Sequence, residues 1–273
     1  DPAQGITTRC YPAKGDGLNV IVEDPAQPNI LWIGTRKQGL AQFDAATETL
    51  TYFPPDPANP QSISFDFVDA IVADRNAPVL WTASMYGGGL NRFDKTTGAF
   101  THYVSNPDDP QTIGSNSITA LYQDRAGRLW IGAKGGGLNL LDPQTNAVTR
   151  YGKAAGIAAD VMSIVEDERG QLWLGATTGL MQFDPQAGKT LRIYTRNDGL
   201  QDGAFNPSCA WKTRRGELWF GGAKGANSFA PEQLRDNPFV PPVVLTALKQ
   251  GGEPMKTGTQ PMFLDNIALG WQQ

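Results

Sequence analysis

Aspartate and tryptophan recur together along this chain, at a spacing that could serve cation binding or sugar binding. An acidic residue lies about seven positions before each of four tryptophans, and a fifth tryptophan follows a threonine. The pairs are Asp24 and Trp32, Asp74 and Trp81, Asp124 and Trp130, Asp167 and Trp173, and Thr213 and Trp219. Clustered carboxylates could hold a metal ion, and indole rings could stack on a ligand. Because every copy has the same pattern, a scaffold role is the stronger interpretation.

These aspartates are expected to close tight turns by accepting backbone N–H bonds. A second set precedes a later turn of each copy, at Asp44, Asp94, Asp142 and Asp184. None of them belongs to an Asp-x-Asp-x-Asp-Gly loop of the kind that binds calcium. The tryptophans are expected to pack between neighbouring repeats. We therefore predict no metal site and no cofactor.

The sequence gives weak support to nucleophilic catalysis and to phosphate binding. His102 is the single histidine, and it lies in an expected outer strand, so neither a Ser-His-Asp triad nor a histidine metal cluster is predicted. The runs 87–89 and 135–137 are all glycine but lack the Gly-Lys-Ser/Thr of a phosphate loop. Cys10 and Cys209 are too few for a disulfide framework, and their redox state stays open. No catalytic residue is predicted.

The tryptophans are 49, 49, 43 and 46 residues apart, which indicates a repeat of supersecondary units. Short apolar runs of period two, bounded by Gly, Asp, Pro and Asn, predict four strands in each repeat. Four antiparallel strands in 43–49 residues are typical of a β-propeller blade. The predicted fold is all-β, a propeller of five recognisable four-stranded blades spanning residues 1–236.

The two ends of the repeat region complement each other. The segment 8–11 matches the fourth-strand pattern, whereas the fifth copy has no recognisable fourth strand. We expect the N-terminal strand, within residues 6–11, to act as a clasp that completes the fifth blade and removes open sheet edges. From residue 237 the repeat stops. Residues 237–273 are expected to be a linker and the first strands of an incomplete immunoglobulin-like domain.

Composition excludes several classes of function. The net charge is −4 and no basic stripe is present, so nucleic acid is not an expected partner. No apolar run reaches the ~18 residues of a membrane span, so no membrane segment is expected in this chain. The 31 glycines and 20 prolines are spread along the chain, as suits a β protein rich in turns.

The repeat resembles that of the two-component regulator propeller (Reg_prop) family. Its best copy combines Asp-x-x-Gly-x-Leu-Trp-Ile-Gly at 124–132 with Gly-Gly-Leu-Asn-Leu-Leu at 136–141. The segments 229–234 and 241–246 look like the junction with the immunoglobulin-like domain, named for three tyrosines, that follows such propellers. Family members usually have seven blades, whereas five copies are present here.

The resemblance implies a periplasmic sensor, the extracytoplasmic part of an inner-membrane receptor. In such receptors a membrane helix and a cytoplasmic kinase or diguanylate cyclase follow, so the parent protein is expected to be membrane-anchored. The sensor itself is expected to be non-catalytic, and to dimerise through the downstream domain.

A binding site is expected on the loop face. The connections between blades are long, and the loops between second and third strands carry the glycine runs. Both kinds of loop should share one face of the propeller. By position, the candidates for holding a small molecule or an oligosaccharide are Arg36, Lys37, Phe67, Met85, Tyr86, Asn116, Lys134, Phe205, Asn206, Trp211 and Lys224. Trp211 stands out because the other copies have Val72, Tyr122 and Val165 there.

Two alternatives remain open. A lyase or glycosidase on the same face would need two carboxylates directed at one pocket. The acids of the connecting loops that could supply them are Asp66, Asp160, Asp198 and Asp202. Streptogramin-type lyases resemble this chain in scaffold, but their catalytic histidine has no convincing counterpart here. A protein-interaction scaffold would instead present a large apolar patch.

Overall fold

The computed structural model describes residues 17–143, 145–157, 160–234, 249–250 and 253–254. The chain divides into two compact units, Asp1–Gln233 and Leu234–Gln273. In the second unit, the described residues form a short antiparallel pair, β20 (Lys249–Gln250) and β21 (Glu253–Pro254). The expected clasp at residues 6–11, Cys10 and nearly all of segment 237–273 lie outside the described residues.

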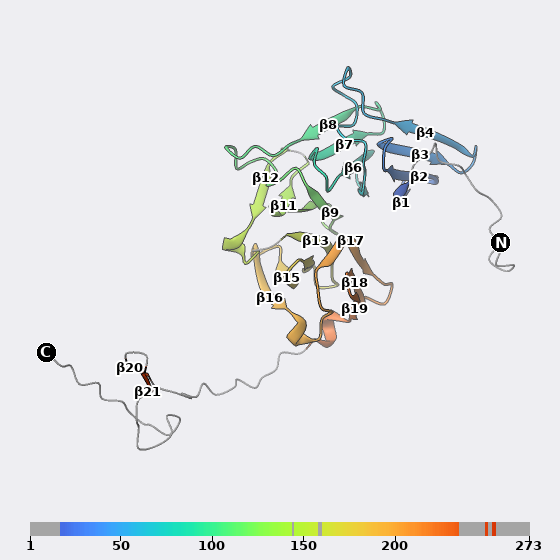
Figure 1. Ribbon diagram of the computed structural model, residues 1–273. Coiled ribbons are helices and arrows are strands. Elements are labelled where there is room, and N and C mark those ends of the chain that lie inside the picture. Colours follow the sequence, from blue (N-terminus) through green and yellow to red (C-terminus); the bar gives the residue numbers. More distant parts are fainter. Residues whose placement is uncertain (1–16, 144, 158–159, 235–248, 251–252, 255–273) are drawn as a thin grey trace. The chain divides into compact units, whose positions relative to one another are not determined.

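The first unit is a β-propeller of five antiparallel sheets, which confirms the predicted fold class (Figure 1). The first sheet contains β1 (Leu18–Asp24), β2 (Gln27–Thr35), β3 (Leu40–Asp44) and β4 (Thr49–Phe53). The second contains β5 (Ala70–Ala73), β6 (Val79–Ala83), β7 (Leu90–Asp94) and β8 (Phe100–Tyr103). The third contains β9 (Ile118–Gln123), β10 (Leu129–Ala133), β11 (Gly137–Leu141) and β12 (Val148–Tyr151).

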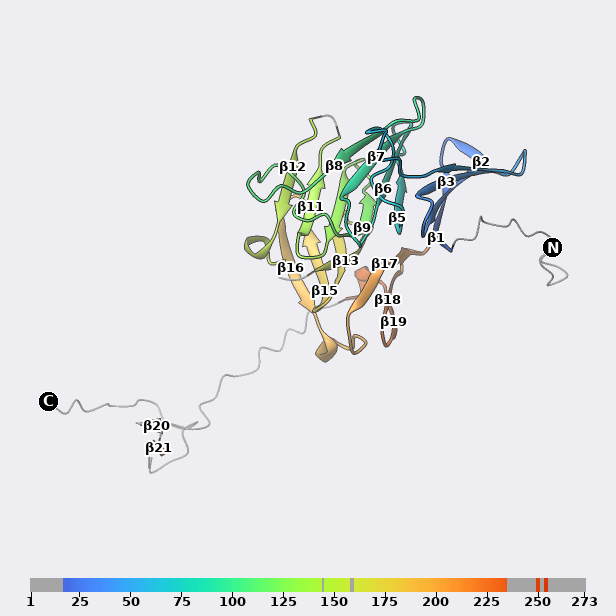
Figure 2. The same ribbon diagram turned by 45° about the horizontal axis from the view of Figure 1, so that its top comes forward.

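The fourth sheet has the same order, with β13 (Val161–Glu166), β14 (Leu172–Ala176), β15 (Gly179–Asp184) and β16 (Lys189–Tyr194). In the fifth, the described residues form three strands, β17 (Phe205–Lys212), β18 (Leu218–Gly222) and β19 (Gly225–Phe229). Three short 3-10 turns, η1 (Lys153–Ala155), η2 (Arg196–Asp198) and η3 (Pro231–Gln233), lie in connections. Figures 1 and 2 show the sheets following one another in chain order, with β9, β13 and β17 toward the middle.

The repeated aspartate has two roles in each of the first four sheets. In the third sheet, Asp124 Oδ1 accepts the backbone N–H of Arg128 at 2.9 Å, which closes the turn as predicted. Its Oδ2 accepts the indole N–H of Trp130 at 2.8 Å. The same indole bond joins Trp32 to Asp24, Trp81 to Asp74 and Trp173 to Asp167, at 2.8, 3.3 and 2.9 Å. Each buried indole donor is therefore satisfied inside its own sheet.

Packing between sheets also repeats. Trp32, Trp81, Trp130 and Trp173 are at most 2% exposed, as predicted. Each packs on the aromatic residue that closes its own sheet, and three of them also reach the next sheet. Trp32 meets Phe93 at 5.5 Å between ring centroids, Trp130 meets Phe183 at 5.9 Å, and Trp173 meets Phe229 at 4.8 Å. Most of the core therefore lies between blades, and a smaller cluster of Ile33, Ala41 and Phe43 lies within the first sheet.

The fifth sheet departs from the pattern. Thr213 replaces the aspartate, and Trp219 is 43% exposed, outside the buried clusters of the described residues. The glycine after the second-strand tryptophan differs too. A Cβ added at Gly132 would lie 2.8 Å from the carbonyl oxygen of Val161 in the next sheet, whereas at Gly221 it would meet its own sheet's Cys209 at 3.4 Å. Gly221 therefore lacks the close contact with a next sheet that Gly132 has, and the Trp219 side chain stays in part open.

Loops of adjacent blades meet on one face, as expected. The backbone N–H of Gly39 donates to the carbonyl of Asp66 at 2.8 Å, and that of Gly89 donates to the carbonyl of Asn116 at 3.1 Å. The long β8–β9 loop is held by Arg150 of β12, whose guanidinium donates to the carbonyls of Thr112 and Asp109 at 2.6 and 2.7 Å. The loop face is therefore rigidly attached to the sheets below it.

Candidate functional site

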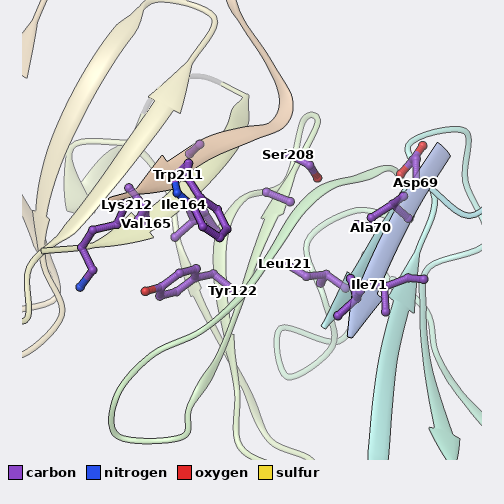
Figure 3. Close-up of a pocket in the computed structure, with 14 residues that line it drawn as sticks. Asp69, Ala70, Ile71, Leu121, Tyr122, Ile164, Val165, Ser208, Trp211 and Lys212 are labelled. Atoms are coloured by element: carbon purple, nitrogen blue, oxygen red, sulfur yellow. The ribbon is translucent and has the colours of Figure 1, made fainter. Parts of the chain in front are cut away.

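The innermost strands of the five sheets surround a central cavity of about 410 Å³ (Figure 3). Its walls are mainly aliphatic. The lining residues are Val20, Val22, Asp69, Ala70, Ile71, Ala120, Leu121, Tyr122, Ile164, Val165, Ser208, Ala210, Trp211 and Lys212. Residues separated by up to about 190 positions in the sequence therefore share one enclosure, because every blade places its first strand toward the axis.

Asp69 supplies the carboxylate of this cavity. It comes immediately before β5, and its Oδ2 accepts the backbone N–H of Met85 at 3.1 Å. Burial raises the pKa of Asp69 to about 6, against the lowering effect of the hydrogen bonds from the Met85 and Asp69 backbone. Within the described residues Asp69 forms no ion pair. The cavity thus holds a half-buried acid with spare acceptor capacity.

Trp211 and Ser208 enter the cavity from β17. Trp211 is 71% exposed, and it is paired across the sheet with Trp219. Ser208 has φ of 53° in an irregular part of the strand, and its hydroxyl donates to the carbonyl of Thr119 at 3.2 Å. Figure 3 shows the Trp211 ring directed toward Tyr122, with Ser208 between Trp211 and Asp69. The expected location of Trp211 near the channel agrees with this placement.

Three other predicted residues gather beside Asp69. Phe67 and Tyr86 make an edge-to-face contact with ring centroids 4.7 Å apart, and Tyr86 is 73% exposed. Met85, between β6 and β7, provides the N–H that Asp69 accepts. The β4–β5 connection and the β6–β7 loop of the second sheet therefore build an aromatic rim next to the acid.

The remaining predicted site residues do not line the central cavity. Arg36, Lys37, Lys134 and Lys224 are exposed in the loops that follow second strands, and Arg36 Nε donates to Asn19 at 3.0 Å. Asn206 is exposed in β17. They stay candidates for the outer part of the loop face.

Two predicted residues have structural surroundings instead. The Phe205 side chain is 2% exposed and packs against Phe220, with ring centroids 5.7 Å apart. Asn116 is half-buried, and its Oδ1 accepts the backbone N–H of Ser105 at 2.6 Å. Phe205 therefore stabilises a blade interface and Asn116 closes a loop, so neither side chain is presented to a ligand.

Three of the four acids proposed for an enzyme, Asp160, Asp198 and Asp202, have local partners. Asp160 accepts the N–H of Gly135 at 2.7 Å, and Asp198 accepts the backbone N–H of Thr195 at 2.8 Å, which lowers the pKa of Asp198. Asp202 lies 3.5 Å from Arg196 in an exposed ion pair. Among the residues that the structure describes, Asp69 is the sole carboxylate that lines the central cavity. Among the described residues, no group of three or more His, Cys, Asp or Glu could hold a metal ion.

Sequence reasoning missed Asp69, and a signal was present. At this level of the innermost strand, the five blades carry Asn19, Asp69, Thr119, Met162 and Ser208. The side chains of Asn19 and Thr119 donate to backbone carbonyls of the next blade, those of Val68 and Val161. An ionised aspartate cannot donate such a bond. A single acid in a row of otherwise neutral side chains, three of which donate, therefore marks a departure from the scaffold pattern.

One family model matches the chain. Residues 112–135 match the family described as two component regulator propeller. This segment includes the turn aspartate Asp124 and the buried Trp130. No curated protein matches the chain. In the described part of the chain, none of the helices has the length and apolar character to cross a membrane.

Solved structures share the fold. The extracellular domain of a protein described as a one component system from B. thetaiotaomicron has a TM-score of 0.61 and 18% identity. That of a hybrid two component system from the same organism has a TM-score of 0.50 and 21% identity. The structure of U3-55K gives a TM-score of 0.63 at 8% identity.

The alignments cover 82%, 90% and 82% of this chain, and 28%, 39% and 64% of those three chains. The chain thus spans less than half of the two signalling domains. Since U3-55K also shares the fold, the propeller alone does not specify a function.

Proposed function

We propose that this chain, which carries the two component regulator propeller repeat, is a ligand-sensing domain of a bacterial membrane-bound signalling receptor, exposed to the periplasm and non-catalytic by itself. The observation that carries the proposal is the central cavity, in which an open Trp211 ring and the unpaired Asp69 carboxylate face apolar walls. Concave sites with aromatic surfaces and a few placed polar groups are typical of small-molecule binding.

The likeness to extracellular domains of signalling proteins supports the same proposal. Five inner strands from all blades meet at the cavity, so a ligand there would contact the whole ring at once. A ligand that binds the folded state more tightly than competing states shifts the population toward it. That shift is the signal that a receptor could pass to attached domains.

The test is a thermal-shift screen of small metabolites against the purified chain. A ligand at 100 times its Kd should add about 2.7 kcal/mol to the free energy of unfolding and so raise the Tm. The shift should be lost in Trp211→Ala and kept in Trp219→Ala, a matched tryptophan that does not line the cavity. A library without hits, or hits indifferent to Trp211→Ala, would contradict the proposal.

Two further readouts separate the remaining parts of the proposal. A hit recovered chemically unchanged after long incubation agrees with a non-catalytic sensor, whereas turnover would favour the lyase or glycosidase alternative. In spheroplasts of the producing cells, added protease should degrade this domain. Protection from the protease would contradict periplasmic exposure.

A protein-interaction scaffold is the second candidate, and one observation favours it. Trp211 and Trp219 lie opposite each other on β17 and β18, at 71% and 43% exposure. Exposed paired indoles are typical of interface anchors. If the ring docks proteins, Trp219→Ala should weaken partner binding as much as Trp211→Ala does, which a cavity ligand would not show.

A further inference from the structure

We propose that the central cavity takes a ligand with a protonated amine on a compact apolar body, the amine at Asp69 and the body against Trp211. This inference rests on the proposed sensing function and adds a ligand class to it. It follows from three features of the cavity: an acid without a cation, walls with few polar groups, and an uncovered indole.

The acid lacks a positive partner. Asp69 Oδ2 receives one N–H bond from Met85, and within the described residues no lysine or arginine forms an ion pair with it. A carboxylate has about four acceptor sites. The backbone N–H groups of Met85 and of Asp69 itself satisfy only part of that capacity. A half-buried charge in this condition is costly, and an ammonium group would offset that cost by supplying both charge and hydrogen bonds.

The neighbouring polar side chains are already engaged with the scaffold. Asn19, Thr119 and Ser208, at the same level of the ring, each donate to a backbone carbonyl of another blade. They fix the blades to one another. Asp69 has no such role, because its carboxylate accepts, and this leaves it available to a ligand.

The one basic group of the lining is also occupied. Lys212 lies 3.2 Å from Glu168, in an ion pair between the fifth and fourth blades. Burial raises the pKa of Asp69 and backbone hydrogen bonds oppose that rise, and no charged side chain is among the causes of the shift. Neither the strands packed around Asp69 nor the loop of Met85 therefore supplies a cation that would compete with an amine.

The cavity walls indicate the chemistry of the rest of the ligand. Nine of the lining residues are Val, Ala, Ile or Leu, so the hydroxyl groups of a sugar would find few partners there. An apolar body would instead displace water from these walls and lie on the open face of Trp211. Tyr122, toward which the Trp211 ring is directed in Figure 3, adds a second aromatic surface for an ammonium or its methylene groups.

This arrangement makes binding sensitive to pH. The amine needs Asp69 ionised, so the affinity should be constant at pH 7–8 and fall as the pH drops through about 6. A neutral ligand of the same shape should show no such loss.

The experiment compares 2-phenylethylamine, 2-phenylethanol and 3-phenylpropanoate by calorimetry at pH 8. These probes share a ring and a short chain but differ in charge. We expect the amine to bind about tenfold more tightly than the alcohol, since a hydrogen bond to a charged group is worth more than a neutral one. The propanoate should bind most weakly.

Variants show which residues cause the difference in affinity between the amine and the alcohol. Asp69→Asn, which keeps the shape of the side chain, should remove the advantage of the amine but leave the alcohol unchanged. Trp211→Ala should weaken both. Asp160→Asn, an acid of the loop face outside this cavity, serves as control and should leave the amine unaffected. A melting curve for each variant verifies folding.

Three results would overturn the inference: equal affinity for amine and alcohol, an amine advantage that survives Asp69→Asn, or no binding of the amine at millimolar concentration. If a screening hit still depends on Trp211 in any of these cases, the sensing function stands and the amine class is wrong. If no compound of either experiment binds, the sensing function fails as well.

Discussion

Asp69 shows how one residue can act against stability. Its pKa rises from 3.8 to about 6 on folding, so the folded state holds the proton more tightly than the unfolded state. The contribution of Asp69 to stability is therefore most favourable below pH 4, declines as the pH rises toward about 6, and is constant above that. A carboxylate kept in this condition weakens the fold, which agrees with a role in binding.

The corresponding prediction concerns Asp69→Asn. At pH 7 the variant should be more stable than the wild type, because the buried charge is gone and an amide oxygen can still accept the Met85 N–H. Since part of the carboxyl is solvated, we expect ~1 kcal/mol, or about 2–4 °C in Tm. Thermal melts from pH 4 to pH 8 would measure it.

The control variant for this prediction should change the stability in the opposite direction. The pKa of Asp44 is lowered, chiefly by the backbone N–H of Ala46, so Asp44→Asn should lose stability at neutral pH rather than gain it. Equal behaviour of the two variants would mean that Asp69 is not desolvated in solution.

At the scale of elements, Arg150 couples a strand to a loop. Its guanidinium, on β12, donates to carbonyls of Asn106, Asp109 and Thr112 and to the Thr112 hydroxyl. His102 does the same for the previous loop through one contact, to the carbonyl of Ser62 at 2.8 Å. Long loops that would otherwise be mobile are thus fixed above the sheets.

Arg150→Ala should release the loop between β8 and β9. Four donated bonds are lost, and the carbonyls that accepted them can be satisfied in part by water, so we expect about 1–3 kcal/mol of destabilisation. Hydrogen exchange should speed up at residues 104–117 and stay unchanged in the fourth sheet. Arg196→Ala, which removes an exposed ion pair with Asp202, should cost under ~0.5 kcal/mol.

At the scale of the whole molecule, stability lies in the contacts between blades. A blade buries its tryptophan only against the next blade, so the sheets depend on one another. The fifth sheet tests this rule, because the same residue type at the same position, Trp219, is 43% exposed and has no aspartate partner.

Trp130→Ala and Trp219→Ala should therefore differ sharply. Trp130 is fully buried and bonded to Asp124, so its loss should cost about 3–5 kcal/mol. Trp219→Ala should cost less than ~1 kcal/mol, since much of its ring stays in water. Denaturant unfolding of both variants measures the difference, and similar losses would show that Trp219 is covered in solution.

Much of the fold was predictable because the repeat is local. The turn aspartate, the strand tryptophan and the glycine bend each act within about 45 residues of one another, so their spacing predicts the sheets and their order. The sequence also predicted in part which residues lie in the loops, as Phe67, Met85 and Tyr86 show. The Phe205 side chain packs against Phe220, because an aromatic residue at a strand end can point to either face, and packing decides which.

What the sequence by itself determined is the architecture: strand pattern, turn chemistry and blade number follow from residues close together in the chain. The tertiary structure alone decided which side chains share the central cavity. Asp69 and Trp211 are 142 positions apart, and they line one cavity because the five sheets place their first strands toward a common axis. The raised pKa of Asp69 depends on the same packing, since a carboxylate loses its water only when other strands lie around it.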